Sequence, residues 1–232
     1  MVINIASKQY ELDKKIDMLL DTLIYIQENI DPSLSFKYNC RSGVCGSCAV
    51  RVNGVEKLAC DCKIEEGAIV EPLKNLPVVK DLIVESANIS SKLQMVEKEL
   101  YNTHEVTQEE IEAIDVESNC ILCNSCYSSC PVYEYNQDFI GPFALTRAYR
   151  YFNDKKCDED TQKLEKVQKS GVWDCTLCGA CSMVCPQSID IKNDIQKLQN
   201  FSVQNGYQNP YTAQSFGGFD LGGDFGFNPN GF

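Results

Sequence analysis

Residues 120–131 read CILCNSCYSSCP, and residues 175–186 repeat the same spacing as CTLCGACSMVCP. Each run follows the pattern CxxCxxCxxxCP, so four cysteines and a closing proline recur at matching positions. Proline has no N–H donor and a fixed φ, which turns the chain away after the last cysteine. The repeat therefore predicts two related thiolate sites in the second half of the chain.

This spacing is that of two-cluster bacterial ferredoxins, in which three cysteines of a run bind one cubane iron-sulfur cluster and the fourth binds the other. Zinc ribbons also use CxxC pairs, but they need neither the third cysteine nor the Cys-Pro step of each run. The pattern therefore predicts two 4Fe-4S sites with crossed ligands. The first set is Cys120, Cys123, Cys126 and Cys185, and the second set is Cys130, Cys175, Cys178 and Cys181.

A third cysteine motif, CRSGVCGSC, spans residues 40–48. Its C-x4-C-x2-C spacing is typical of plant-type 2Fe-2S sites, which need a fourth, more distant cysteine, whereas structural zinc prefers paired CxxC knuckles. Asn53 and Gly54 predict a tight hairpin turn that brings Cys60 back beside the motif. Cys62 would share the strand face of Cys60 and stays an alternative fourth ligand. The expected 2Fe-2S set is Cys40, Cys45, Cys48 and Cys60.

Two glycines, Gly43 and Gly46, lie inside this motif. Because glycine adopts positive φ without strain, they let the loop fold back and bring backbone N–H groups toward the sulfides. Such donors stabilise an anionic cluster and tune its reduction potential. Their placement agrees with a 2Fe-2S loop.

Bulk composition narrows the function classes. The chain has 232 residues, 14 cysteines and a net charge of -12, so we expect no nucleic-acid partner. The cysteines lie in short-range runs, which suit metal or redox sites better than the disulfides of a secreted scaffold. No stretch has the length and apolarity of a membrane span, and the N-terminal residues lack the apolar core of a secretory signal. We therefore expect a soluble polypeptide that partners could still hold at a membrane.

Local patterns predict an α+β fold. Residues 2–10 alternate as a strand, and residues 16–30 place leucines on one helical face. Thr107 and Glu110 form a capping-box signature, and Pro142 suits the first turn of a helix. We expect a β-grasp 2Fe-2S ferredoxin-like domain at residues 1–85, a helical linker at 86–116, an α-helical bacterial-ferredoxin-like domain with two cubane clusters at 117–200, and a disordered Gly/Phe/Asn-rich tail at 201–232.

Several conspicuous residues fall outside the three motifs. Cys157 fits neither spacing and is interpreted as an ordinary thiol. His104 lies in a polar linker and is expected at the surface. Trp173 is expected to pack beside a cluster, and Arg147 and Arg150 to lie on a solvated helix face or to face a partner.

Residues 1–200 resemble the iron-sulfur subunits of succinate dehydrogenase and fumarate reductase. The resemblance is carried by LLDTLIYIQENIDPSLSFKYNCRSGVCGSCAVRVNG, LAC at Cys60, EPLKNLPVVKDLIV, CILCNSCYSSCP, DFIGPFALTRAYRYFND and CTLCGACSMVCP. It implies an electron-transfer subunit between a flavoprotein, whose FAD interconverts succinate and fumarate, and a membrane-anchor or quinone-reactive subunit. The 2Fe-2S end would face the flavin, and the last cluster would face the quinone side.

The sequence departs from this family in three places. Cys178 stands where most members have another residue and a 3Fe-4S cluster, so a complete 4Fe-4S cube is expected here, with 3Fe-4S as the alternative. Glu134 and Tyr135 replace a tryptophan pair that many succinate dehydrogenases carry, and Thr176 replaces a histidine common in quinone-reducing members. These changes favour fumarate-reductase-like branches, including methylmenaquinol- or thiol-linked enzymes.

Substrate chemistry is expected on another subunit, because the chain has no GxGxxG loop, no nucleophile elbow and no candidate acid-base pair. Two alternatives stay open: the iron-sulfur subunit of a glycolate-oxidase-like or heterodisulfide-reductase-like complex, and a free ferredoxin-like carrier. The expected location is cytoplasmic, peripheral on the inner face of the cell membrane through partner subunits. Export with a partner would place the complex in the periplasm instead.

Overall fold

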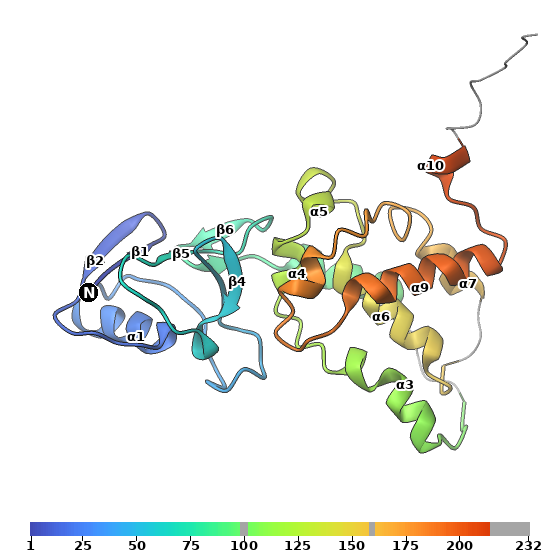
Figure 1. Ribbon diagram of the computed structural model, residues 1–232, viewed down its shortest axis with the longest axis horizontal. Helices are drawn as coiled ribbons and strands as arrows, with labels where there is room; N and C mark the ends of the chain where they lie inside the picture. The colour runs from blue at the N-terminus through green and yellow to red at the C-terminus, as the bar shows by residue number, and fades with distance from the viewer. Residues whose placement is uncertain (98–101, 158–160, 214–232) are drawn as a thin grey trace, which may run out of the picture.

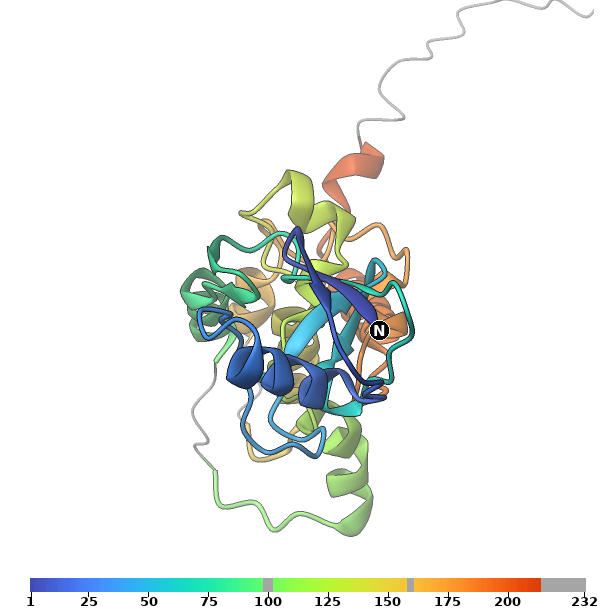
Figure 2. The ribbon, with the colours of Figure 1, turned by 90° about the vertical axis from the view of Figure 1, so that its left-hand side faces the viewer.

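The computed structural model describes residues 1–97, 102–157 and 161–213. Two parts follow each other along the long axis, a sheet-containing N-terminal part and a helical part (Figure 1). Viewed from the N-terminal end, the N-terminal part lies in front of the helical part (Figure 2). This arrangement agrees with the predicted α+β class.

A five-stranded sheet with the order β2-β1-β5-β3-β4 forms the N-terminal part. Its strands are β1 (Val2–Ile5), β2 (Lys8–Glu11), β3 (Ala49–Val52), β4 (Val55–Leu58) and β5 (Ile69–Glu71). β1 pairs with β5 in parallel, and the other pairs are antiparallel. Helix α1 (Leu19–Asn29) buries Leu23 and Ile26 completely in the core that also holds Ile3 and Ile5. One helix over a mixed sheet is the expected β-grasp arrangement.

Two local expectations need correction here. Residues 2–10 do not form one strand, because Ala6 and Ser7 adopt φ values of 46° and 71° and turn the chain into an antiparallel pair. The segment has no glycine, proline, asparagine or aspartate at these positions, and Ser7 alone is a weaker turn signal, so the alternating pattern hid the turn. The first helix begins at Leu19 and ends at Asn29, inside the predicted range of 16–30.

The predicted hairpin is confirmed. Val52 pairs with Val55 across the turn, and both Asn53 and Gly54 have positive φ, at 50° and 83°. Positive φ at both central residues is what a type I′ turn requires. The Asn53 carboxamide oxygen also accepts a hydrogen bond from the Ile69 N–H at 2.9 Å, which attaches the turn to β5.

Short elements connect the two parts: β6 (Val78–Lys80), β7 (Ile83–Val84), α2 (Ala87–Val96) and α3 (Gln108–Ser118). The capping box is confirmed, because Thr107 Oγ1 accepts from the Glu110 N–H and the Glu110 carboxylate accepts from the Thr107 N–H. Within the helical linker expected at 86–116, α2 ends at Val96 and α3 begins at Gln108, and positions 98–101 lie outside the described residues.

The helical part packs around α6 (Pro142–Asn153) and α9 (Ile191–Gln204), which lie against each other. Pro142 occupies the first turn of α6, as expected. The remaining helices are α4 (Ser125–Ser128), α5 (Pro131–Tyr135), α7 (Thr161–Lys166), α8 (Ala180–Met183) and α10 (Pro210–Ala213). No helix in the described ranges combines the length and apolarity needed to cross a membrane.

The tail expectation is wrong for residues 201–213. Helix α9 continues to Gln204, and Ser202 is fully buried and accepts a hydrogen bond from Gln168 Nε2 at 2.9 Å. Tyr211 in α10 hydrogen-bonds to the Asp174 carboxylate. The polar composition masked a helix that is anchored by tertiary contacts. Residues 214–232 lie outside the described residues.

Hydrogen bonds join the two parts of the chain. Ser128 Oγ donates to Glu56 Oε1 at 2.6 Å and accepts from the Lys74 N–H at 2.8 Å. The Asn75 side-chain amide lies within 3.0 to 3.2 Å of three carbonyl oxygens, those of Tyr127, Ser128 and Cys130. We call this set, Glu56, Lys74, Asn75 and Ser128, the junction.

We expect Asn75→Asp to lower the free energy of unfolding by about 1–3 kcal/mol, because a carboxylate would face three carbonyl oxygens that lose their donor. Anaerobic urea unfolding of the cluster-loaded protein measures the change. Asn53→Asp is the matched control, since Asn53 also has positive φ but its side-chain oxygen accepts, which aspartate can still do. Equal stability of the two variants would contradict this account of the junction.

Candidate iron-sulfur sites

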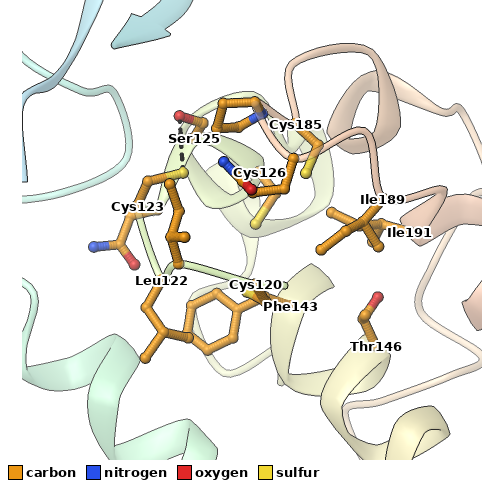
Figure 3. Close-up of a pocket in the computed structure, with 14 residues that line it drawn as sticks. Cys120, Leu122, Cys123, Ser125, Cys126, Phe143, Thr146, Cys185, Ile189 and Ile191 are labelled. Carbon is orange, nitrogen blue, oxygen red and sulfur yellow. Dashed lines mark hydrogen bonds between the residues drawn. The ribbon is translucent and has the colours of Figure 1, made fainter. Parts of the chain in front are cut away.

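A cavity in the helical part is lined by the four cysteines of the first predicted set (Figure 3). Cys120 and Cys123 come from the loop before α4, Cys126 lies in α4, and Cys185 follows α8. Phe143, Thr146, Ile189 and Ile191 are also among the residues of the wall. Cys185 thus joins three cysteines of the other run, which is the crossed arrangement expected from the sequence.

The reciprocal crossing occurs at a second cavity. It is lined by Cys130 from the first run together with Cys175, Cys178 and Cys181 from the second. Phe139, Pro142 and Ile195 supply apolar surface, and the Lys192 side chain also lines the cavity. The structure therefore brings together each predicted set of four. That these sets hold clusters stays a prediction.

The two cysteine runs adopt matching backbones. Leu122 and Leu177 both have a φ of 54°, and Asn124 and Gly179, the residues before α4 and α8, have φ values of 67° and 82°. In each loop two positive-φ residues flank a cysteine, and they wrap the loop around its cavity and turn N–H groups inward. The Leu177 N–H, for example, donates to Cys175 Sγ at 3.4 Å.

The first half of the chain supplies the third site. Cys48 Sγ lies 3.4 Å from Cys60 Sγ, as the hairpin predicted. The Ser42 N–H donates to Cys40 Sγ at 3.4 Å, and Cys45 Sγ lies 3.1 Å from Ser47 Oγ. Gly43 and Gly46 have φ values of 76° and 68°, so both occupy the conformation for which glycine was expected.

Cys62 lies elsewhere. The chain leaves β4 after Leu58 and forms a 3-10 turn, η1 (Ala59–Asp61), so Cys60 and Cys62 do not share a strand face. Cys62 is buried among the apolar residues of the N-terminal core, with its Sγ 3.4 Å from the Lys63 carbonyl oxygen. This turn makes Cys60 the geometrically favoured fourth ligand.

The thiol environments suit metal-bound sulfur. The Ser42 N–H lowers the pKa of Cys40 to about 6, which favours its thiolate. Burial raises the pKa of Cys48 to about 11 and that of Cys181 to about 12, and it raises the pKa of Cys126 well above its usual value. Buried thiols of this kind lose their protons when a metal centre supplies the compensating positive charge.

The arrangement of the cysteines distinguishes an iron-sulfur cluster site from a site for a single metal ion. Within the described part of the chain, no three Cys, His, Asp or Glu side chains converge closely enough to hold one metal ion. The cysteines instead surround the two cavities from several sides. Iron-sulfur clusters are held in this way by thiolates, whereas tetrahedral zinc needs four ligands at bonding distance from one point. The donor sets therefore fit iron-sulfur clusters.

The loop of the third site presses against the loop of the first cavity. A Cβ atom at Gly46 would lie 2.8 Å from Cys123 Cβ and 2.9 Å from the Ile121 carbonyl oxygen. Gln187 Nε2 also donates to the Gly43 carbonyl at 3.2 Å. The cysteine loops of the two parts are thus in van der Waals contact.

The residues outside the motifs have structural partners. His104 pairs with the Glu110 carboxylate at 3.1 Å, and Trp173 Nε1 donates to Gln168 Oε1 at 2.7 Å. Arg150 Nε donates to Ser118 Oγ at 2.8 Å. Burial raises the pKa of the Cys120 thiol, and the charge of Arg147 partly opposes this shift. Cys157 is buried and lines neither four-cysteine cavity.

Sequence reasoning missed three residues at the sites. Lys192 lines the second cavity, and the hydroxyls of Ser47 and Ser125 contact cysteine sulfurs. Each serine stands two residues after a cysteine of its motif, and this spacing could have pointed to them. Lys192 carries no local signal, because α9 reaches the cavity only through tertiary packing.

Comparison with known proteins identifies the family. Residues 4–91 match the 2Fe-2S iron-sulfur cluster binding domain, and residues 117–189 match the 4Fe-4S dicluster domain. The fumarate reductase iron-sulfur subunit of Escherichia coli O157:H7 is 36% identical over 191 residues, covering 77% of this chain and 78% of the relative. This chain belongs to the iron-sulfur subunits of the fumarate reductase and succinate dehydrogenase family.

Other relatives agree. The Mycobacterium tuberculosis (strain CDC 1551 / Oshkosh) fumarate reductase iron-sulfur subunit is 37% identical over 195 residues, with 78% of this chain and 79% of the relative covered. A fumarate reductase (CoM/CoB) subunit of Methanothermobacter marburgensis is 32% identical over 205 residues, 86% of this chain but 41% of its own length. A chain of the Mycobacterium smegmatis Sdh1 complex in the apo form has the same fold, with a TM-score of 0.81, 21% identity, and coverage of 89% and 97%.

Family membership confirms the resemblance drawn from the sequence and the α+β fold with its two kinds of iron-sulfur domain. The chain is an iron-sulfur electron-transfer subunit of this oxidoreductase family. The comparisons favour this assignment over the glycolate-oxidase-like, heterodisulfide-reductase-like and free-carrier alternatives.

The turn at η1 generates a prediction about the fourth ligand. We expect Cys60→Ser to lose the 2Fe-2S cluster and its two irons, and Cys62→Ala to keep them, because only Cys60 Sγ faces Cys48 Sγ. Iron quantification and the EPR spectrum of the reduced 2Fe-2S cluster measure both variants. Retention of the cluster by Cys60→Ser together with its loss from Cys62→Ala would reverse the assignment.

Proposed function

We propose that this chain relays single electrons between a flavoprotein subunit, whose FAD interconverts fumarate and succinate, and a redox partner at the opposite end of the chain. The contact between Gly46 and the Cys123 loop carries the proposal, because it joins the 2Fe-2S site to the site of the first cube. The 2Fe-2S end faces the flavoprotein in this arrangement, and the second cube faces the other partner.

The proposed ligands are the twelve motif cysteines. They are Cys40, Cys45, Cys48 and Cys60 for the 2Fe-2S cluster, Cys120, Cys123, Cys126 and Cys185 for the first cube, and Cys130, Cys175, Cys178 and Cys181 for the second cube. When bound, the clusters supply one-electron oxidation and reduction. The protein contributes the thiolates, the inward N–H donors and the apolar walls that limit water.

The lining of the two cavities supports a conducting role. Besides cysteines, both are lined mainly by apolar and neutral polar residues, with Lys192 as the one cationic side chain and with no carboxylate or histidine among the lining residues. Proton transfer to an organic acid needs a positioned acid or base. Reduction of fumarate is therefore proposed to occur on the flavoprotein.

Whether the second cavity holds a 4Fe-4S or a 3Fe-4S cluster depends on Cys178. This residue lines the second cavity with the other three cysteines of its set, which supports a complete 4Fe-4S cube rather than a 3Fe-4S cluster. It is also the cysteine most open to solvent at that site. A partner can therefore approach this cube closely.

Two exposed side chains lie in the segments that carry cysteines of the second cavity, where such a partner would bind. Tyr135 in α5 and Met183 in α8 are 90% and 80% exposed, and both belong to the segments that carry cysteines of the second cavity. We propose a membrane-anchor, quinone-reactive or thiol-reactive subunit here. The proposed location is the cytoplasmic face of the cell membrane, or the periplasm after export with a partner.

Anaerobic purification of the tagged full-length chain from its native host tests the function. The proposal predicts co-purification with an FAD-containing flavoprotein, and reduction of fumarate by the isolated complex with reduced viologen as the donor. A monomer that carries all its clusters but has no flavoprotein and no such activity would contradict the subunit role and support a free carrier.

The assignment of a 4Fe-4S cluster to the second cavity predicts the effect of Cys178→Ser. We expect loss of about one iron per chain and the EPR signal of an oxidised 3Fe-4S cluster, because three thiolates remain for the second cube. Cys157→Ala is the control, since Cys157 lines neither cavity. Because a serine oxygen can itself bind iron, Cys178→Ala is measured beside it, and an unchanged iron content in both variants would show that Cys178 is not a ligand.

The close contact at Gly46 predicts slower electron transfer in Gly46→Ala. The added methyl group collides with Cys123 and Ile121 and forces the loops apart, and tunnelling rates fall exponentially with distance. Gly43→Ala is the matched control variant, because Gly43 has a similar positive φ but nothing within 4 Å of an added Cβ. Rapid-freeze EPR measures reduction of the 2Fe-2S cluster after mixing with a low-potential donor.

We expect this reduction to slow in Gly46→Ala, with full cluster content, and to keep its rate in Gly43→Ala. Equal rates in the two variants would contradict a path through the Gly46 contact.

A further inference from the structure

Two of the three sites place a serine hydroxyl against a cysteine sulfur. Ser125 Oγ lies 3.4 Å from Cys123 Sγ at the first cube, as the dashed line in Figure 3 marks. Ser47 Oγ lies 3.1 Å from Cys45 Sγ at the 2Fe-2S site. Each serine follows its cysteine by two residues, so both contacts arise from the local Cys-x-Ser sequence.

The second cube lacks this hydroxyl although its backbone matches. Cys178-Gly179-Ala180 occupies the position of Cys123-Asn124-Ser125 in the repeat. Asn124 and Gly179 both precede a short helix in the left-handed conformation, and Ser125 and Ala180 are the first residues of α4 and α8. At the position of Ser125 and Ala180, the two sites therefore differ by one oxygen atom, attached at equivalent points of the loop.

A cluster ligand fixes the direction of the hydrogen bond. Cysteine bound to iron is a thiolate and has no proton to donate, so the serine hydroxyl must be the donor. Ser125 is only 1% exposed, so water has little access to replace it, whereas Ser47 is exposed and water competes there. The buried contact at the first cube is thus expected to affect the reduction potential of its cluster more than the exposed contact at the 2Fe-2S site does.

Donation to a ligating sulfur alters the redox balance. Reduction adds one electron to the cluster and makes its sulfur atoms more negative, so a hydrogen-bond donor stabilises the reduced state more than the oxidised one. The hydroxyl keeps its proton, and no covalent bond forms or breaks. The presence of the donor raises the reduction potential, and its absence lowers it.

We propose that Ser125 is a tuning residue that raises the reduction potential of the first cube relative to the second, where Ala180 withholds the equivalent donor. The inference rests on the proposed function, because it requires clusters in both cavities. With Ser47 acting in the same way at the 2Fe-2S site, the two clusters nearer the flavoprotein gain potential over the second cube. Electrons are thereby favoured to move from the second cube toward the flavoprotein, the direction of fumarate reduction.

The test uses the cluster-loaded full chain with its partners, in wild type, Ser125→Ala and Ala180→Ser. EPR-monitored redox titration gives the midpoint potential of each cube. We expect Ser125→Ala to shift the reduction equilibrium of the first cube about tenfold toward the oxidised form, which is about 59 mV for a one-electron couple. The second cube in the same variant is the internal control and keeps its potential.

Ala180→Ser should do the reverse and raise the potential of the second cube alone. This gain of a donor decides the proposal if Ser125→Ala fails to assemble its cluster. Assembled cubes whose potentials do not move in either variant would overturn the tuning role and leave the proposed function intact. Absence of cubane signals from the wild-type complex would contradict the proposed function itself.

Discussion

The contact between Gly46 and the Cys123 loop is the constraint on which the rest of the structure depends. An electron relay needs neighbouring centres, and here one loop from the sheet and one from the helical part meet with no room for a side chain. The junction of Glu56, Lys74, Asn75 and Ser128 maintains that approach through hydrogen bonds between the two parts. Docking of the two parts is therefore a functional requirement of the fold.

The crossed arrangement of the cysteines would also hold the segments of the helical part together. Cys130 leaves the first run for the second cavity, and Cys185 leaves the second run for the first. Each cluster would thus crosslink segments far apart in sequence, which stabilises a part whose helices α4, α5 and α8 have no more than five residues each. Cluster binding and folding are expected to be coupled.

The sequence predicted those features that depend on local spacing. The four-cysteine sets, the Asn53-Gly54 turn and the capping box at Thr107 all follow from residues close together in the chain, and the structure places each as expected. It could not predict features set by distant packing. The burial of Ser202 that extends α9 and the meeting of Gly46 with Cys123 depend on partners remote in sequence.

The central claim is that the 2Fe-2S cluster and the first cube are immediate neighbours. The most direct measurement is the spin relaxation of the reduced 2Fe-2S cluster in the anaerobically isolated complex, recorded with the first cube oxidised and then reduced. Neighbouring paramagnets relax each other, so relaxation of the 2Fe-2S signal should become faster when the cube is reduced. Relaxation that is the same in both states would contradict this account, as would a zinc-loaded chain without acid-labile sulfide.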